Sequence, residues 1–228
     1  MQRVLLIGAG GIGRRHLYGF THSGRAELAV CEPDEERRKA AAEEWNITEC
    51  YDTLDAAPLD RFDAAVLCAP AHLHLPLGTR CVEAGLPLLM EKPLAVTMDG
   101  VEAFRDLVRE RGVPVRLGYI RRCTDIVQQF RDQLRAGRAG TLRLVRFLAA
   151  QDYRKYRPDY ADIYYARAAT GGGAILDCAS HFIDLLVWMF GEIAEVTAVA
   201  EKLDFEKTEC EDTVFLLFRF RETPILAE

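Results

Sequence analysis

The feature that most constrains this chain is a glycine-rich turn near its start, between an apolar strand and a helical pattern. Residues 4–7 form a run of leucine and β-branched side chains, and the spacing G-x-G-x-x-G follows at once. In this context the first glycine permits a tight turn, the second lets a pyrophosphate approach the backbone, and the third lets helix and strand pack closely. A glycine-rich turn without a ligand is the alternative. The predicted cofactor loop consists of Gly8, Gly10, Gly11, Ile12 and Gly13.

The first half of the chain alternates short apolar runs with helical patterns. Strands are predicted at residues 4–7, 28–31, 63–68, 87–90 and 113–119, and helices at 13–23, 35–45, 73–84 and 97–111. Asp34 and Thr97 stand where helix caps are expected. Such alternation predicts an α/β Rossmann domain over residues 1–120, with a parallel sheet that binds ligands at the carboxyl ends of its strands.

An acidic residue, Glu32, ends the second predicted strand, about 20 residues beyond the glycine loop. A carboxylate there accepts hydrogen bonds from a ribose 2′-hydroxyl and repels a 2′-phosphate, which favours NAD. Arg37 and Arg38 follow in the next helix and could offset that repulsion, so NADP stays possible. A solvated loop acid is the alternative interpretation of Glu32.

From about residue 121 the alternation stops. A helix is predicted at residues 124–137 and strand-like runs at 142–150, 195–202 and 213–220, which together indicate an α+β domain with a mainly antiparallel sheet over residues 121–228. Both faces of the run 213–220 are apolar. One face would cover helices, and the other either a partner subunit in a homo-oligomer or a part of the protein that this sequence lacks.

The stretch GGGAILDCASHFIDLL, residues 171–186, is an apolar helix pattern that carries polar residues on one side. Asp177 and His181 are four residues apart and share a face of a regular α-helix, with Asp184 near the same stripe. An acid one turn from a histidine can orient its ring for proton exchange with a substrate hydroxyl. A helix-start acid and a core histidine would be the structural alternative.

Composition excludes several classes of function. The net charge is −6 and no long basic run occurs, so a nucleic-acid partner is not expected. The apolar runs look far shorter than the ~18 residues of a membrane span, so no membrane association is expected either. Seven scattered cysteines without a secretion signal favour reduced thiols and a cytoplasmic protein.

At this point the sequence resembles the Gfo/Idh/MocA family of sugar and inositol oxidoreductases. The matching segments, in order along nearly the whole chain, are GAGGIG, CAPAHLH, EKP, GYIRR and GGGAILDCASHFIDLL. The resemblance implies an NAD(P)-dependent dehydrogenase that moves a hydride between the nicotinamide and a secondary alcohol of a sugar, inositol or related polyol. It also implies that the Lys92–Pro93 bond is often cis.

The resemblance assigns roles to individual residues. Lys92, His181 and Asp177 would be catalytic, with Lys92 and His181 meeting over the nicotinamide. Further cofactor contacts would come from Pro70, His74, Glu91 and Lys92. No metal ion is expected at the site. The predicted substrate contacts are Tyr119, Arg122, Tyr165, Arg167, Asp177 and His181. Cys123 departs from the family, which often has an aromatic residue there.

The chain is shorter than members of this family usually are. It ends at TPILAE, inside the predicted second sheet, so we expect a second domain that is truncated or naturally short. Two rival functions remain open. One is a nucleotide-binding sensor or relative without catalysis, and the other is metal-dependent hydrolysis through His72, His74 and His181, for which no acid completes a ligand set.

Overall fold

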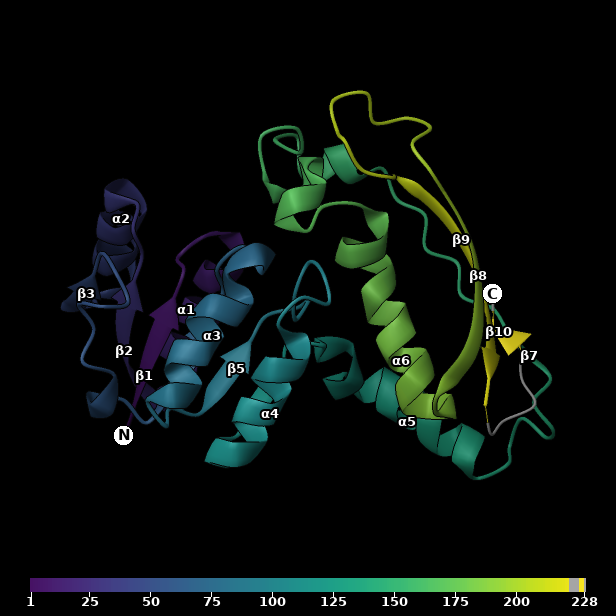
Figure 1. Cartoon of the computed structure of the whole chain (residues 1–228), viewed down its shortest axis with the longest axis horizontal. Helices are drawn as coiled ribbons and strands as arrows, with labels where there is room; N and C mark the ends of the chain where they lie inside the picture. The colour runs from purple at the N-terminus through teal and green to yellow at the C-terminus, as the bar shows by residue number, and fades with distance from the viewer. Residues whose placement is uncertain (222–225, 228) are drawn as a thin grey trace. The chain divides into compact units, whose positions relative to one another are not determined.

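A computed structural model describes residues 1–221, 226 and 227, and the chain divides into two compact units, Met1–Gly118 and Tyr119–Glu228. Each unit has its own sheet (Figure 1). Of the terminal segment TPILAE, only Leu226 and Ala227 are among the described residues.

The first unit is built on a six-stranded parallel sheet in the order β3-β2-β1-β4-β5-β6. The strands are β1 Gln2–Ile7, β2 Ala26–Cys31, β3 Glu49–Tyr51, β4 Ala64–Leu67, β5 Leu88–Met90 and β6 Val115–Leu117. The helices are α1 Gly11–Ser23, α2 Glu35–Trp45, α3 His74–Glu83 and α4 Val101–Arg111. This arrangement confirms the predicted Rossmann fold.

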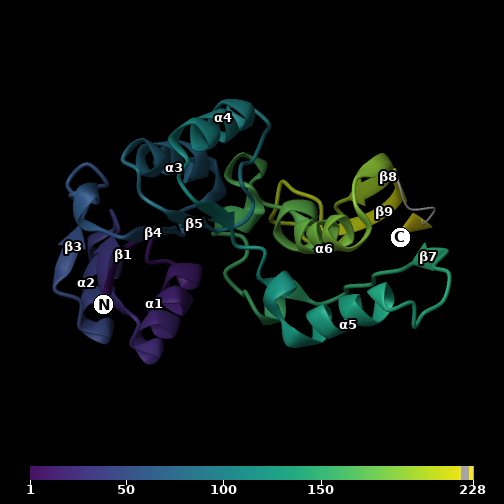
Figure 2. The ribbon, with the colours of Figure 1, turned by 90° about the horizontal axis from the view of Figure 1, so that it is seen from below.

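Strand β1 is buried on both faces, which explains its continuous apolar run. Val4 and Leu6 join a core cluster with Leu17 of α1, whereas Leu5 and Ile7 join the cluster that contains Val82 of α3. Figure 2 shows α3 and α4 on the face of this sheet opposite to α1. The sheet is therefore held between two helical layers, and its carboxyl edge is left for loops.

Of the two predicted helix caps, Asp34 is confirmed and Thr97 is not. The Asp34 side chain accepts a hydrogen bond from the Arg37 amide at 2.8 Å, which confirms it as the cap of α2. The prediction that Thr97 caps the next helix is wrong, because α4 starts only after Gly100, whose φ of 77° interrupts a helical backbone. The Thr97 hydroxyl instead accepts a hydrogen bond from the amide of Asp99.

The second unit carries a four-stranded sheet in the order β7-β10-β9-β8. Its strands are β7 Leu144–Val145, β8 Ile193–Glu201, β9 Thr213–Phe220 and β10 Leu226–Ala227, and its main helices are α5 Asp125–Arg135 and α6 Ser180–Phe190. The pairs β8–β9 and β9–β10 are antiparallel, whereas β7–β10 is parallel, which confirms the mainly antiparallel prediction. The strand predicted over residues 142–150 is wrong beyond Leu144–Val145, because the described residues offer the rest of it no pairing partner.

Helix α6 packs on one face of this sheet. Leu186 and Phe190 form a core cluster with Phe218 and Phe220 of β9. On the opposite face the side chains of Phe215 and Val199 lie directly across from each other and are 49% and 54% exposed. An exposed apolar pair at this register is compatible with the predicted subunit contact, which stays a prediction.

The stretch Ala168–Phe190 is apolar and long enough to meet the length and composition criterion for a membrane span, with a mean hydropathy of 1.4. The segment is interrupted by Asp177, His181 and Asp184, so the expectation that the chain has no membrane association stays a prediction. The core helix of a globular domain meets the same criterion, and here Leu186 and Phe190 pack against β9.

The loop between β8 and β9 is organised by Asp212. Its carboxylate accepts hydrogen bonds from the amides of Leu203, Asp204 and Phe205 at 2.8–3.1 Å and from the Thr213 hydroxyl at 2.8 Å. Burial alone would raise the pKa of Asp212, but these hydrogen bonds outweigh it and lower the pKa to about 2.

We expect Asp212→Asn to lower Tm at pH 7 by roughly 2–4 °C, because an amide accepts the loop N–H groups less well. A carboxyl whose pKa falls on folding stabilises the fold above its unfolded pKa of about 4, and this contribution is lost as the pH drops toward 2. Thermal melts of wild type and variant should therefore converge between pH 4 and pH 2. A Tm difference that does not change with pH would refute this role, and Asp60→Asn, an exposed acid of the first unit, serves as the control.

Candidate active site

Sterics in the loop after β1 require glycine at two positions. Gly8 has a φ of 96°, and a Cβ there would lie 2.9 Å from the carbonyl carbon and oxygen of Cys68. A Cβ on Gly13 would lie 2.0 Å from the carbonyl oxygen of Gly8. By contrast, a Cβ on Gly10 would meet nothing within 4 Å, so this side of the loop is open. Gly8 and Gly13 therefore have the tight-turn and close-packing roles that the spacing predicts, and the approach of a pyrophosphate to Gly10 stays a prediction.

The N-terminus of α1 is suited to an anion. Gly10 is the N-cap residue of α1, and it has no side chain that could accept hydrogen bonds from the N–H groups of the helix. The first turn of α1 contains no acidic residue. Gly11 and Ile12 open the helix, so their amides belong to the first turn, where N–H groups lack helical acceptors. The open space at Gly10 and these amides together fit a dinucleotide pyrophosphate.

Glu32 is 4% exposed and bound to the glycine loop. Its carboxylate accepts hydrogen bonds from the amide of Ala9 at 2.7 Å and from the amide of Asp34 at 3.1 Å. The Arg38 guanidinium donates to the Glu32 carbonyl oxygen at 2.6 Å, and Arg37 forms an ion pair with Asp34 at 3.5 Å. The acid is thus placed beside the loop, while both arginines have partners of their own.

The turn after β5 carries the sequence Glu91-Lys92-Pro93, and its Lys92–Pro93 bond is cis, as the resemblance implied. Glu91 is 7% exposed, and one oxygen of its carboxylate lies 2.8 Å from Nε2 of His16. Its other oxygen accepts a hydrogen bond from the Lys92 amide at 3.3 Å. Sequence reasoning missed His16, although its place in α1, one turn after the glycine loop, was a signal.

The loop after β4 leads through Pro70 and a short 3₁₀ turn into α3, which begins at His74. The His74 side chain is only 1% exposed. Its Nδ1 lies 2.6 Å from the carbonyl oxygen of Pro93, and its Nε2 lies 2.8 Å from that of Ala69. Burial lowers the pKa of His74, whereas the two carbonyl oxygens and Glu91 oppose that shift. The ring therefore joins two loops, and its predicted contact with a cofactor stays a prediction.

In the second unit, a glycine turn precedes the helix of interest. Gly171 and Gly173 have φ values of 88° and 95°, and a Cβ on Gly172 would lie 2.2 Å from the carbonyl oxygen of Tyr165. The Glu211 carboxylate accepts a hydrogen bond from the amide of Ile175 at 2.8 Å and lies against Gly173. Glu211, which sequence reasoning also missed, thus caps the helix that carries Asp177 and His181.

The helix does not begin as a regular α-helix. Residues Ile175–Ala179 form a π-helical turn, in which the amide of Ser180 bonds the carbonyl of Ile175 five residues earlier. The α-helical spacing assumed between Asp177 and His181 is therefore wrong at its start. The Asp177 carboxylate accepts a hydrogen bond from the Tyr164 hydroxyl at 2.6 Å. Burial and the nearby Asp177 charge raise the pKa of Tyr164, which keeps this phenol a donor.

The predicted residues Tyr119 and Arg122 lie beside the helix. The ring of Tyr119 meets that of His181 edge to face, with centroids 5.8 Å apart. Arg122 forms a bidentate ion pair with Asp184, in which its Nε lies 2.6 Å from one carboxylate oxygen. This pair anchors the segment before α5 to α6, and it gives Asp184 a structural role.

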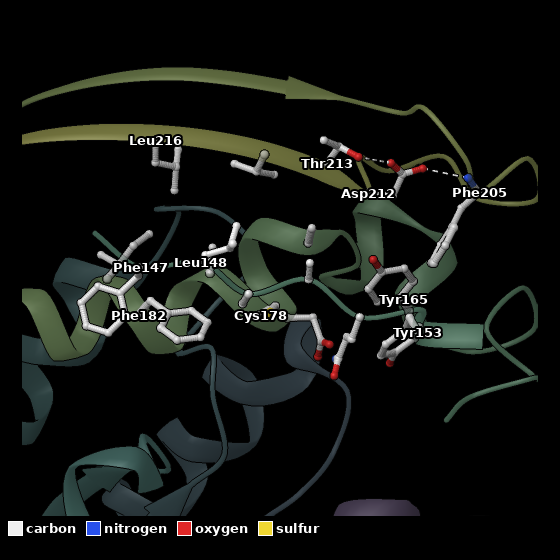
Figure 3. Close-up of a pocket in the computed structure, with 18 of the residues that line it drawn as sticks. Phe147, Leu148, Tyr153, Tyr165, Cys178, Phe182, Phe205, Asp212, Thr213 and Leu216 are labelled. Atoms are coloured by element: carbon white, nitrogen blue, oxygen red, sulfur yellow. Dashed lines mark hydrogen bonds between the residues drawn. The ribbon is translucent and has the colours of Figure 1, made fainter. Parts of the chain in front are cut away.

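A cavity of about 540 Å³ lies within the second unit, between the π-helical turn, α6 and β9 (Figure 3). Asp177 is one of the lining residues, together with Tyr153 and Tyr165, whose rings stack with centroids 4.4 Å apart. Arg167, by contrast, is exposed to solvent. The structure thus brings Asp177 and Tyr165 to one cavity, and it places Tyr119 and Arg122 around His181 and Asp184.

Within the described part of the chain, no group of three His, Cys, Asp or Glu side chains is arranged to hold a metal ion. His74, which the hydrolysis hypothesis requires, directs both ring nitrogens at backbone carbonyl oxygens. All seven cysteines lie among the described residues and are free thiols there.

Comparison with known proteins agrees with this geometry over both units. Residues 2–119 match the model of an oxidoreductase family with an NAD-binding Rossmann fold, and residues 127–225 match the GFO/IDH/MocA C-terminal domain. The chain belongs to the GFO/IDH/MocA family. The family is described by an NAD-binding Rossmann fold, which agrees with NAD as the predicted cofactor, whereas the preference for NAD over NADP stays a prediction.

Two relatives in this family are similar at the sequence level. The rhizopine catabolism protein MocA of Rhizobium meliloti is 31% identical over 83% of this chain and 57% of its own length. An inositol 2-dehydrogenase of Corynebacterium glutamicum is 30% identical over 83% of this chain and 54% of its own length. The chain therefore spans little more than half the length of these relatives.

Solved structures of the family extend the comparison. The WlbA dehydrogenase of Bordetella pertussis, in complex with NADH and UDP-GlcNAcA, superposes with a TM-score of 0.83 at 26% identity, over 99% of this chain and 70% of that one. An oxidoreductase of Agrobacterium radiobacter shares the fold with a TM-score of 0.87 at 20% identity, over 99% and 65% of the two chains.

We expect Gly13→Ala to weaken NAD binding by about 10-fold or more, because the new methyl group would collide with the Gly8 carbonyl and displace the loop. Gly19→Ala in the same helix is the matched control, since a Cβ there meets nothing within 4 Å. Isothermal titration with NAD compares the two variants. Equal affinities would show that close packing at Gly13 does not shape the cofactor loop.

Proposed function

We propose that the chain forms the cofactor-binding and substrate-binding parts of an NAD-dependent dehydrogenase acting on a secondary alcohol of a sugar, inositol or related polyol. One observation carries this proposal. The register of the first sheet sets Ile7, Leu67 and Met90 abreast, so the glycine loop and the Lys92 turn leave the sheet at the same edge. An amine beside a dinucleotide loop suits alcohol oxidation, in which a hydroxyl proton must be managed near the nicotinamide.

Lys92, His181 and Asp177 have different proposed roles in the oxidation of the alcohol. NAD held at the glycine loop and Glu32 would supply the acceptor for the hydride of the alcohol carbon. Lys92 and His181 hold and take up the hydroxyl proton as the carbonyl forms, so the oxidation leaves a ketone, a reduced cofactor and one proton. Asp177, held by Tyr164, orients His181 or binds a neighbouring substrate hydroxyl. This scheme requires one residue from each unit to reach the same substrate.

The second unit supplies groups suited to a polyol. Tyr119 next to His181, Tyr165 in the cavity wall and the exposed Arg167 are the proposed further substrate contacts. Arg122 can contribute only while sharing its guanidinium with Asp184. Relatives named for inositol oxidation, and a WlbA structure that holds a sugar nucleotide, support a polyol or sugar as the substrate class.

The proposal extends to the cofactor preference, the assembly and the location. We infer NAD over NADP from Glu32, a homo-oligomer through the exposed face around Phe215 and Val199, and a cytoplasmic protein. Without the chemistry above, the same cofactor loop would serve a nucleotide-binding sensor. A screen for turnover separates a sensor from an enzyme.

Turnover is tested by following NADH absorbance with a panel of inositols, aldoses and sugar alcohols. We expect at least one to be oxidised, and Lys92→Met to lower kcat by ~10²–10⁴-fold with little change in NAD affinity, because a methionine cannot transfer the proton. Arg111→Met, an exposed cation at the end of α4, is the control. NAD binding without any turnover would favour the sensor, and full activity of Lys92→Met would remove Lys92 from the mechanism.

The role of Glu32 is tested by its alanine variant. We expect Glu32→Ala to weaken NAD binding more than NADP binding, because the carboxylate that would bond the 2′-hydroxyl also repels a 2′-phosphate. Titrations with both nucleotides measure the ratio of the two affinities. A ratio that stays the same would mean that Glu32 only supports the glycine loop through the amide of Ala9.

A further inference from the structure

Two histidines from different helices hold the residues on either side of Lys92. His16 of α1 places Nε2 2.8 Å from the Glu91 carboxylate, and His74 of α3 places Nδ1 2.6 Å from the Pro93 carbonyl oxygen. We propose that His16 and His74 act together as positioning residues that fix the turn of residues 91–93, and with it the amine of Lys92. This inference rests on the proposed function of Lys92.

The contact through His16 links the turn to the cofactor helix. His16 lies in the same helix as Gly11 and Ile12, whose amides form the predicted phosphate site. Its partner Glu91 has little room to move, because a Cβ on Gly118 would lie 2.9 Å from the Glu91 carboxylate. A shift of α1 on binding a cofactor would therefore be passed to Glu91 and on to its neighbour Lys92.

The contact through His74 links the turn to a second loop. The ring bridges the Pro93 carbonyl and the Ala69 carbonyl, which belongs to the loop after β4. A neutral imidazole has one N–H and donates to only one of these acceptors, whereas the charged ring donates to both. In either state the ring is enclosed, at 1% exposure, so it holds the two loops at a fixed separation.

Positioning of this kind affects rate more than binding. A displacement of a catalytic group by about 1 Å can reduce turnover ~10²-fold, since the reacting atoms leave their productive geometry. Lys92 sits on a turn with no helix or strand of its own, between β5 and α4. The two histidines contact its immediate neighbours in the chain, Glu91 and Pro93, and so restrain the turn from both sides of Lys92.

The experiment compares variants that remove or retain the donor. His16→Leu and His74→Phe remove the ring nitrogens, whereas His16→Gln and His74→Gln retain an N–H donor. His22→Leu is the matched control, because His22 lies in the same helix and its ring contacts Tyr18, one turn earlier in α1. Kinetics with NAD and myo-inositol give kcat and KM, and hydrogen exchange with mass spectrometry, at saturating NAD, follows residues 88–96.

We expect His16→Leu and His74→Phe to lower kcat by about 10- to 100-fold, with KM and NAD affinity changed by less than about 3-fold. The glutamine variants should recover most of that loss. In a Lys92→Met background the same substitutions should cause no further drop in kcat, because residues that act through one group are not additive. Exchange over residues 88–96 should rise in the two donor-free variants and not in His22→Leu.

Three results would overturn the inference. They are a loss confined to KM or NAD affinity, a full additional loss in the Lys92→Met background, and unchanged exchange over residues 88–96 in His16→Leu. If His74→Phe does not fold, the half-buried His16 site carries the test alone. The exchange measurement needs no turnover, so it decides the positioning role even when myo-inositol is not oxidised and the proposed function fails.

Discussion

The close approach of Gly13 to Gly8 is the constraint on which the rest of the first unit depends. With only 2.0 Å between a Cβ on Gly13 and the Gly8 carbonyl oxygen, α1 can pack on β1 only as long as Gly13 lacks a side chain. That packing sets the position of α1 over the sheet, and α1 in turn brings His16 to Glu91 at the end of β5. The backbone geometry of the cofactor loop and the placement of the Lys92 turn are therefore parts of one packing arrangement.

The sequence was sufficient to predict those helices and strands whose bounds are set by a few neighbouring residues. The Asp34 cap, the following helix and strand β9 were predicted at the bounds that the structure shows, because a cap or an alternating apolar pattern is contained in a few residues. Strand β3, Glu49–Tyr51, was missed because its three residues owe their extended form to pairing with β2 and not to their own pattern. Residues 146–150 show the reverse case, in which a strand-like pattern finds no partner among the described residues.

The same division applies to the candidate site. Glycine spacing and the Glu91-Lys92-Pro93 motif identified the loops, since both are short and continuous in sequence. The groups that hold those loops came from far along the chain: His16 is 75 residues from Glu91, and Glu211 is 36 residues from Ile175. A single sequence gives no measure of which distant polar residues meet, so these partners emerge only from the folded backbone. Even Tyr164, 13 residues from Asp177, was passed over in favour of the neighbouring Tyr165.

The π-helical turn at Asp177 can be explained by the two ends of its helix. At the start, the Glu211 carboxylate holds the amide of Ile175, and toward the end Asp184 is held by Arg122 while Phe190 packs on β9. An i→i+5 bond accommodates one more residue in a turn than the i→i+4 bond of an α-helix. If both ends are fixed by tertiary contacts, a surplus residue between them must widen one turn, and the turn that widens is the one that carries Asp177. The Asp177 carboxylate in this widened turn accepts a hydrogen bond from Tyr164, so its surroundings depend on tertiary contacts as well as on its helical spacing from His181.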